Sequence, residues 1–277
     1  MIAAVVRRQF SSLLERDDRD IDLAFAALLV AREEYPTMDP RPYLARLDDL
    51  ARQAAARALA ATTVRQVVDA INRVLFADEG LRGNSENYYD PRNSYLNDVL
   101  DRKLGIPISL SIIYLAISDR LGVPMVGIGL PGHFIVRVQT AEQILIDPFH
   151  QGAVLSIEDC AARVREVYGG RVAFQPTMLE VVSKREILTR LLTNLKVIYA
   201  HADDFARLLA IIDRLLLIKP DQIHEFRDRG AVCQQLEFHG QALADLQRYV
   251  QLAPHAKDVD QVRQAIRSIQ QRLAWQN

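Results

Sequence analysis

Apolar residues recur at helical spacing through the first 78 residues of the chain. One stripe of apolar positions runs from Ile21 to Leu29 and is ended by Pro36, and two further stripes follow before residue 76. Apolar positions spaced three and four residues apart mark one face of a helix. We therefore expect a layer of helices over residues 1–78, with their apolar faces turned toward a core.

The helical pattern stops over residues 79–94, where Gly, Asn, Asp, Pro and Ser dominate. These residue types favour turns, so an ordered loop is expected here. Helices before strands, without β-α-β alternation, indicate an α+β fold with three or four antiparallel strands. The expected elements after the loop are two short helices near 94–103 and 109–121 and, from Val- and Ile-rich runs, strands near 124–129, 133–138 and 143–147.

From residue 176 onward the pattern is helical again, and it contains a repeat. Pro220 and Pro254 lie 34 residues apart, each after an apolar stretch, and 34 residues is the period of tetratricopeptide repeats. In that frame Gly230 and Ala242 occupy the two positions that need small residues for close helix packing.

The preceding repeat unit is degenerate, because Lys196 and Leu208 occupy its two small positions. Two units are fewer than the roughly three that a free-standing array needs. We therefore expect the tail to pack on the core or on a helix over residues 256–273 that would cap it.

Composition excludes several classes of function. Lys and Arg number 34 against 35 Asp and Glu, with no basic cluster, so neither nucleic acid nor a membrane is expected as a partner. The N-terminal apolar stretch is too short for a secretory signal, and no segment approaches the roughly 18 apolar residues of a membrane span. The two cysteines, Cys160 and Cys233, are interpreted as free thiols of a cytoplasmic protein.

Three polar residues follow one another in an order that suits nucleophilic catalysis. Ser109 stands near the start of a predicted helix, His133 opens a predicted strand, and Asp147 ends the next strand. A His and an Asp on neighbouring antiparallel strands can form a hydrogen bond, and a helix N-terminus stabilises negative charge on a facing nucleophile. The three residues therefore match the roles of nucleophile, base and orienting carboxylate.

This order resembles the transglutaminase-like, papain-related superfamily. The strings RGNSENYYDPRNSYLNDVLDRKLGIPISLSIIY, LPGHFIVRV and LIDPF are similar, more narrowly, to the bacterial SirB-type proteins, which join such a core to tetratricopeptide repeats. The resemblance covers about residues 20–255. It implies a papain- or transglutaminase-like core and places His133 and Asp147 at the triad positions of the family. The domains expected from it are a transglutaminase-like domain over 1–180, made of a helical N-terminal layer over 1–78 and a core over 79–180, and a repeat domain over 181–277.

The nucleophilic cysteine of that superfamily has no counterpart in this chain. Active members carry Gly-x-Cys at the start of this helix and Gly-Ile-Pro at its far end. When the Gly-Ile-Pro is aligned with Gly122–Pro124 and no gap is allowed, the Gly-x-Cys motif falls on Gly105–Pro107. Pro107 then stands in place of the thiol, with Ser109 and Ser111 further along the helix. A serine hydroxyl is a far poorer nucleophile than a thiolate unless a base activates it.

Each of the three residues also has an ordinary structural interpretation. Ser109 can be a helix N-cap, where serine is strongly favoured. His133 can be a buried, hydrogen-bonded side chain, and Asp147 can simply end its strand. His150 adds a third alternative, a His-Asp-His metal site, although no fourth ligand stands at a telling spacing. We predict neither a metal nor another cofactor.

The loop before the first short helix offers two interpretations as well. Its amides and tyrosines can satisfy one another through Asx turns, as such residues do in irregular backbone. Alternatively they line a cleft around the triad. The residues expected to line such a cleft are Asn84, Tyr88, Tyr89, Asn93, Pro107 and Ser111.

The missing cysteine favours a binding or regulatory protein over an enzyme. Such a protein would keep the cleft and engage a protein or peptide partner through its helical tail, an expectation by analogy of fold. Two alternatives stay open. One is an amide or ester hydrolase or acyltransferase that uses Ser109, His133 and Asp147. The other is a metal-dependent hydrolase that uses His133, Asp147 and His150.

Overall fold

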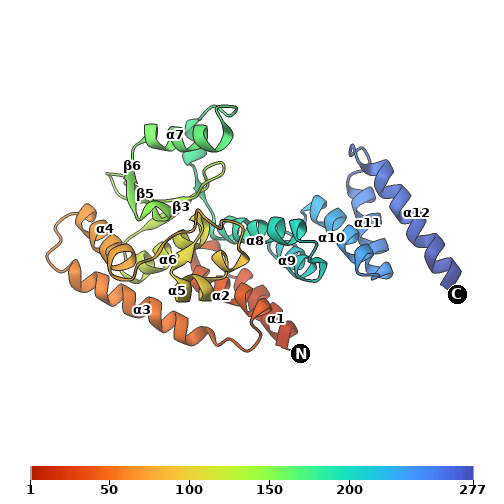
Figure 1. Cartoon of the computed structure of the whole chain (residues 1–277), viewed down its shortest axis with the longest axis horizontal. Coiled ribbons are helices and arrows are strands. Elements are labelled where there is room, and N and C mark those ends of the chain that lie inside the picture. The colour runs from red at the N-terminus through yellow and green to blue at the C-terminus, as the bar shows by residue number, and fades with distance from the viewer. Residues whose placement is uncertain (1, 277) are drawn as a thin grey trace. The chain divides into compact units, whose positions relative to one another are not determined.

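The computed structural model describes residues 2–276 and forms two compact units, the first ending at Leu191 and the second beginning at Leu192. The boundary falls inside one helix, α8 (Lys184–His201). Each unit has its own core and is described separately below. Figure 1 shows the elements of both units in chain order.

The first unit begins with the predicted layer of helices. Side chains cap three of them at their N-termini: Asp22 accepts from the Phe25 N–H, Asp39 accepts from the Arg41 N–H, and Thr63 forms a capping box. Such caps satisfy main-chain donors that a helix start leaves free. The helices are α1 (Ile2–Leu14), α2 (Leu23–Glu34), α3 (Pro40–Arg57) and α4 (Val64–Asn72), and α4 continues into a π-helical turn, η2 (Arg73–Asp78).

Two helices follow the loop, α5 (Leu96–Arg102) and α6 (Pro107–Arg120). Helix α6 is buried on all sides from Pro107 to Ser118, as expected for a helix that is apolar around its whole circumference. It packs against α2 and α3 on one side and against the sheet on the other (Figure 1). Helix α6 is therefore the centre of this unit.

The sheet has five strands in the order β6-β5-β4-β3-β7, and every neighbouring pair is antiparallel. The prediction of three or four strands was too low, because β6 and β7 are too short to show an alternating pattern. The strands are β3 (Met125–Ile128), β4 (Ile135–Val138), β5 (Leu145–Asp147), β6 (Ala153–Leu155) and β7 (Val181–Val182). A separate two-residue parallel pair joins β1 (Arg82–Gly83) to β2 (Leu104–Gly105).

Helix α7 (Ile157–Tyr168) covers part of the sheet face that α6 leaves open. Its Cys160 and Val164 join Ile135 and Leu145 in a buried cluster. The α+β fold that the sequence predicts is therefore correct, with helices on both faces of the sheet.

The second unit contains the end of α8 and four further helices. A Cβ on Gly230 would lie 2.7 Å from the Leu246 side chain and 3.3 Å from the Ala242 carbonyl oxygen, so the predicted small positions do bring two helices close together. The C-terminal helix packs on that pair through Val262 and Ile269 and caps it. The helices are α9 (Phe205–Ile218), α10 (Ile223–Gln235), α11 (His239–Leu252) and α12 (Val259–Gln276). Among the described residues, no helix has both the length and the apolar character that crossing a bilayer requires.

Candidate functional site

Asp147 ends β5 and at the same time begins the 3-10 turn η4 (Pro148–His150). Its Oδ1 atom accepts hydrogen bonds from the main-chain N–H groups of Phe149, at 3.1 Å, and His150, at 3.3 Å. This capping arrangement fixes the carboxylate and leaves its second oxygen, Oδ2, available to other donors.

His133 stands in the turn just before β4. Its N–H donates to the Leu130 carbonyl oxygen at 3.1 Å, and Gly132 has a positive φ of 71°. A Cβ on Gly132 would lie 2.3 Å from a Val167 side-chain carbon on α7, so only glycine fits this turn. The turn directs the His133 ring toward the end of β5.

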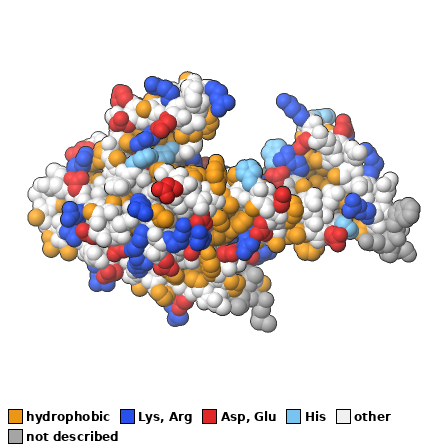
Figure 2. All heavy atoms as spheres, viewed as in Figure 1, with side chains coloured by type: hydrophobic (Ala, Val, Ile, Leu, Met, Phe, Trp, Pro, Cys, Tyr) orange, Lys and Arg blue, Asp and Glu red, His pale blue; other side chains and the backbone are white. Residues whose placement is uncertain are grey.

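One carboxylate oxygen of Asp147 contacts two imidazole rings. Nε2 of His133 lies 2.8 Å from Oδ2, and Nδ1 of His150 lies 2.7 Å from the same atom. Asp147 is fully buried and His133 nearly so, whereas the His150 side chain is 40% exposed. The first unit has no other histidine, and Figure 2 shows histidine surface on it beneath α7. The predicted His133–Asp147 pairing is therefore present, and His150 completes a His-Asp-His cluster.

The electrostatics of the cluster keep the carboxylate ionised. Burial acts to raise the pKa of Asp147, but the hydrogen bonds from His133 and His150 outweigh it and hold that pKa well below its usual range. Arg163 on α7 adds a guanidinium whose Nε lies 3.7 Å from Oδ2. Asp147 is thus a buried anion beside two histidines that donate hydrogen bonds to it and one guanidinium that carries positive charge.

Ser109 makes three hydrogen bonds, all of them with the main chain. Its Oγ donates to the carbonyl oxygen of Asn93, at 2.6 Å, lies 3.1 Å from that of Ile106, and accepts from the Ile106 N–H at 3.0 Å. Ile106 is the N-cap of α6, so Ser109 stands at the third helical position, not at the N-cap that we expected. The hydroxyl is fully buried, and the structure does not bring it into a hydrogen bond with His133.

Pro107 is the first residue of α6 and is buried. Proline suits this position because its fixed φ fits the helix and it lacks an N–H that would have no partner there. Ser111, one turn later, is fully buried, and among the residues that the structure describes its Oγ has no hydrogen-bond partner. Neither residue presents a nucleophile to solvent.

The loop amides satisfy one another, in line with the first of its two interpretations. Nδ2 of Asn84 donates to Oδ1 of Asn93 at 3.0 Å, and Nδ2 of Asn93 donates to the carbonyl oxygens of Asn87, at 2.7 Å, and Tyr88, at 3.2 Å. Both Asn84 and Asn93 are buried. Their polar atoms hold the loop in shape and are directed into it.

The loop tyrosines connect this loop to the histidine cluster. The Tyr88 ring meets the Phe149 ring edge-on at 6.4 Å, and Phe149 lies edge-on to His133 at 6.1 Å and to His150 at 5.1 Å. Tyr89 packs edge-on against Tyr88 and is 66% exposed. The tyrosines therefore lie beside the cluster, one half-buried and one at the surface.

Sequence reasoning missed three residues that shape this site. Phe149 could have been found, because it lies between Asp147 and His150 in the chain. Arg163 and Arg190 carry no such signal in the sequence. Arg190 is on α8, and its Nη2 donates to the carbonyl oxygens of Leu130, at 2.8 Å, and His133, at 2.7 Å. Their proximity to the cluster follows only from the fold.

His133, Asp147 and His150 are also the residues that could hold a metal ion, since one ligand atom from each lies within 4.8 Å of the others. However, Nε2 of His133 and Nδ1 of His150 both stand at hydrogen-bond distance from Oδ2 of Asp147. To donate to that oxygen, each of the two nitrogens must carry a proton. A ligating nitrogen must present its lone pair instead. The geometry as it stands fits a hydrogen-bonded cluster better than a set of metal ligands.

Comparisons with known proteins match both parts of the chain. A family model described as the transglutaminase-like superfamily matches residues 41–193, and a tetratricopeptide repeat model matches residues 195–267. A UPF0162 protein of Xylella fastidiosa is 38% identical over 267 residues, covering 95% of each chain. F-box only protein 21 of Homo sapiens is 34% identical over 170 residues, which are 57% of this chain and 26% of that protein.

One solved structure is also similar to this chain. A crystal structure of menin aligns with 94% of this chain and 72% of its own, with a TM-score of 0.39 and 13% identity. At that level the likeness says nothing about chemistry.

Proposed function

The chain belongs to the transglutaminase-like superfamily and, within it, to the SirB-type UPF0162 proteins, and on that premise we propose that it binds other proteins and catalyses no acyl transfer. The proposal rests on the start of α6, where a transglutaminase-like enzyme would carry its thiol. The ungapped alignment places Pro107 there, and the nearest hydroxyl, that of Ser109, is fully buried and bonded to the main chain.

The two thiols of the chain support the same conclusion. Burial raises the pKa of Cys160 and that of Cys233 to about 11, so neither is a thiolate near neutral pH. Both residues are buried, Cys160 in the sheet cluster and Cys233 in the core of the second unit. An acyl transfer that begins with attack by sulfur therefore has no candidate nucleophile.

The histidine cluster, in this proposal, is a structural and recognition element. Asp147 receives its hydrogen bonds from both histidines, which leaves Nδ1 of His133 and Nε2 of the partly exposed His150 for other partners. The second unit supplies the other recognition surface, since stacked helical repeats form extended concave binding surfaces. Val197 is 40% exposed there and Phe238 is 54% exposed.

A test of the absence of catalysis compares the full chain with two serine variants. Purified protein is assayed for hydrolysis of a nitrophenyl ester and a peptide anilide, and for transfer of a glutamine acyl group to an alkylamine. We expect rates equal to those of the His133→Ala variant. Turnover that is lost in Ser109→Ala but kept in Ser118→Ala, a second buried serine on α6 that donates to the Leu115 carbonyl, would overturn the proposal.

A test of protein binding uses surface variants of the full chain. Tagged wild type, Val197→Asp and Phe238→Asp are used as baits in an extract of the organism that encodes the chain, and Gln251→Asp, an exposed polar position on α11, is the matched control. We expect partners that the wild type and the control retain and that the two apolar variants lose. Identical sets of captured proteins from all four baits would count against a role for this surface.

A further inference from the structure

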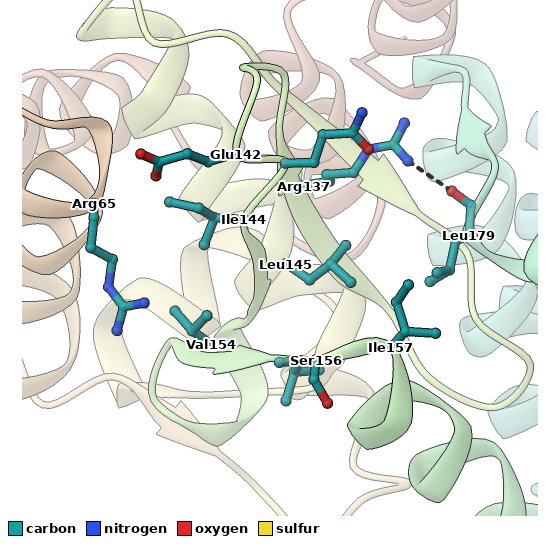
Figure 3. A pocket seen from close by; sticks show the side chains of 11 residues that line it. Arg65, Arg137, Glu142, Ile144, Leu145, Val154, Ser156, Ile157 and Leu179 are labelled. Atoms are coloured by element: carbon teal, nitrogen blue, oxygen red, sulfur yellow. Dashed lines mark hydrogen bonds between the residues drawn. The ribbon is translucent and has the colours of Figure 1, made fainter.

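A hollow separate from the histidine cluster lies on the sheet face that α7 only partly covers. It has a volume of about 480 Å³, within the range of small-molecule sites. Its lining includes Leu145, Leu155, Ile157 and Leu179, which form an apolar floor and rim. Figure 3 labels Leu145, Ile157 and Leu179 around the hollow.

The strand register places a cation at the end of that apolar floor. Arg137 pairs with Leu145 across β4 and β5, and Leu145 pairs with Leu155 across β5 and β6. Residues directly opposite one another share a face of the sheet, so the three side chains form one row across the strands. Arg137 thus begins a row whose other two members are leucines.

The guanidinium of Arg137 has no counter-ion in the part of the chain that the structure describes. It is half-buried and donates from Nη1 to the Leu179 carbonyl oxygen at 3.2 Å, which uses one of its five donors. Within the described residues, no carboxylate lies within ion-pair distance of it. The remaining donors of this guanidinium are therefore free to bind an anion.

Two other charged residues line the hollow, one of each sign. Arg65 of α4 lies on the opposite side from Arg137 (Figure 3), and among the described residues it makes one ion pair, a loose, exposed one with Asp69 at 3.4 Å. Glu142 lines the hollow too and makes no ion pair with any described residue. Because Asp69 already pairs with Arg65, Arg137 is the guanidinium of the lining that is left to receive an anionic ligand.

We propose that this hollow binds an apolar carboxylate, with its carboxyl group on Arg137 and its apolar part on Leu145 and Leu155. Arginine matches a carboxylate bidentately, and an apolar floor rewards burial of the remainder of the ligand. Such a group can belong to a free apolar acid or to the C-terminus of a peptide with apolar side chains. This site is independent of the proposed function of the histidine cluster.

The proposal is tested with octanoate, with its neutral counterpart octanamide, and with an acetylated valine-leucine-leucine tripeptide that has a free carboxyl terminus. Binding to the full chain is followed by calorimetry and by methyl NMR of leucine and isoleucine. We expect octanoate or the tripeptide to bind at least tenfold more tightly than octanamide and to shift Leu145, Leu155 and Leu179. The tighter of the two identifies the source of the carboxylate.

Three variants localise the effect. Arg137→Gln is expected to weaken carboxylate binding at least tenfold, while Arg165→Gln, at an exposed arginine on α7, leaves it unchanged.

Ile157→Glu keeps the test valid if Arg137→Gln fails to fold, because Ile157 is 57% exposed and stands at the first position of a helix, where an acidic residue is favourable. It is expected to weaken carboxylate binding at least threefold. The proposal would be overturned if neither octanoate nor the tripeptide binds more tightly than octanamide, or if carboxylate binding is undiminished in both variants.

Discussion

Arg190 holds the main chain of His133 in place across 57 residues of sequence. Its Nη2 donates to the His133 carbonyl oxygen at 2.7 Å and to that of Leu130 at 2.8 Å, so a single guanidinium nitrogen closes both ends of the turn. The guanidinium also lies over the Phe134 ring, 5.6 Å from its centroid. Burial lowers the pKa of Arg190, a cost that these contacts offset.

Replacing Arg190 with lysine is expected to loosen the His133 turn. A lysine ammonium is a compact, strongly hydrated charge that does not lie over an aromatic face as a guanidinium does, so a loss of about 2 kcal/mol is expected. Chemical denaturation measures that loss, and NMR of the His133 ring reports its position. Arg171→Lys is the matched control, since Arg171 is exposed and also donates to a carbonyl, that of Tyr168. Equal stability of both variants would show that Arg190 does not hold the turn.

Asp147 is expected to make the first unit sensitive to acid. Its pKa is lowered in the folded chain relative to an unfolded value of about 3.9, so the ionised carboxylate stabilises the fold above that value. The stabilisation is lost as the pH falls below about 4 toward the folded pKa. Asp147→Asn should therefore lose about 3 kcal/mol at pH 7 and show a shallower decline in stability between about pH 5 and pH 2 than the wild type does.

The control for this pH effect is Asp17→Asn, a carboxylate of the same unit whose side chain is 75% exposed. Its unfolding free energy should follow that of the wild type across the same pH range. A steep acid transition that survives unchanged in Asp147→Asn would mean that other groups govern acid unfolding.

Ser109 is expected to contribute to stability rather than to chemistry. Ser109→Ala removes the acceptor for the Ile106 N–H and leaves the buried Asn93 carbonyl oxygen without its 2.6 Å donor. Leaving buried polar groups unpaired should cost about 2 kcal/mol. Thermal melts compare it with Ser118→Ala, which loses one hydrogen bond to a carbonyl within its own helix and should cost about 1 kcal/mol. If Ser109→Ala has the same melting temperature as the wild type, the Ser109 hydroxyl does not stabilise the start of α6.

The sequence could predict those regions of the molecule that depend on local pattern. Helical stripes, the strand runs and the spacing of Gly230 and Ala242 follow from residue order, and the structure bears them out. The His133–Asp147 pair was predictable because adjacent antiparallel strands align their ends. The contacts of Ser109 and Arg190 were not, because their partners are main-chain carbonyls, which carry no residue identity in a sequence.

Zinc is expected to leave the histidine cluster unchanged. Each ring already directs a proton at Asp147, and the Arg163 guanidinium, 3.7 Å from the same oxygen, would repel a dication. Stoichiometric zinc should therefore produce no shift in the ring signals of His133 and His150, and chelation should not change the melting temperature. A stoichiometric complex that disappears in the His150→Ala variant would instead support the metal-dependent alternative.

Pro107→Cys tests whether the first position of α6 faces the histidine cluster. If it does, the new thiol gains both the helix N-terminus and the neighbouring His133, and its pKa should fall below about 7 from the usual value of about 8.5. Ultraviolet absorbance of the thiolate gives the titration directly. The native thiols do not interfere, because burial raises the pKa of each to about 11.

The matched control is Ile157→Cys, which stands at the first position of α7 and gains a helix N-terminus alone. Adding His133→Ala should raise the thiol pKa of Pro107→Cys but not that of Ile157→Cys. Identical titrations of the two thiols would mean that residue 107 does not occupy the nucleophile position and that the ungapped alignment is wrong.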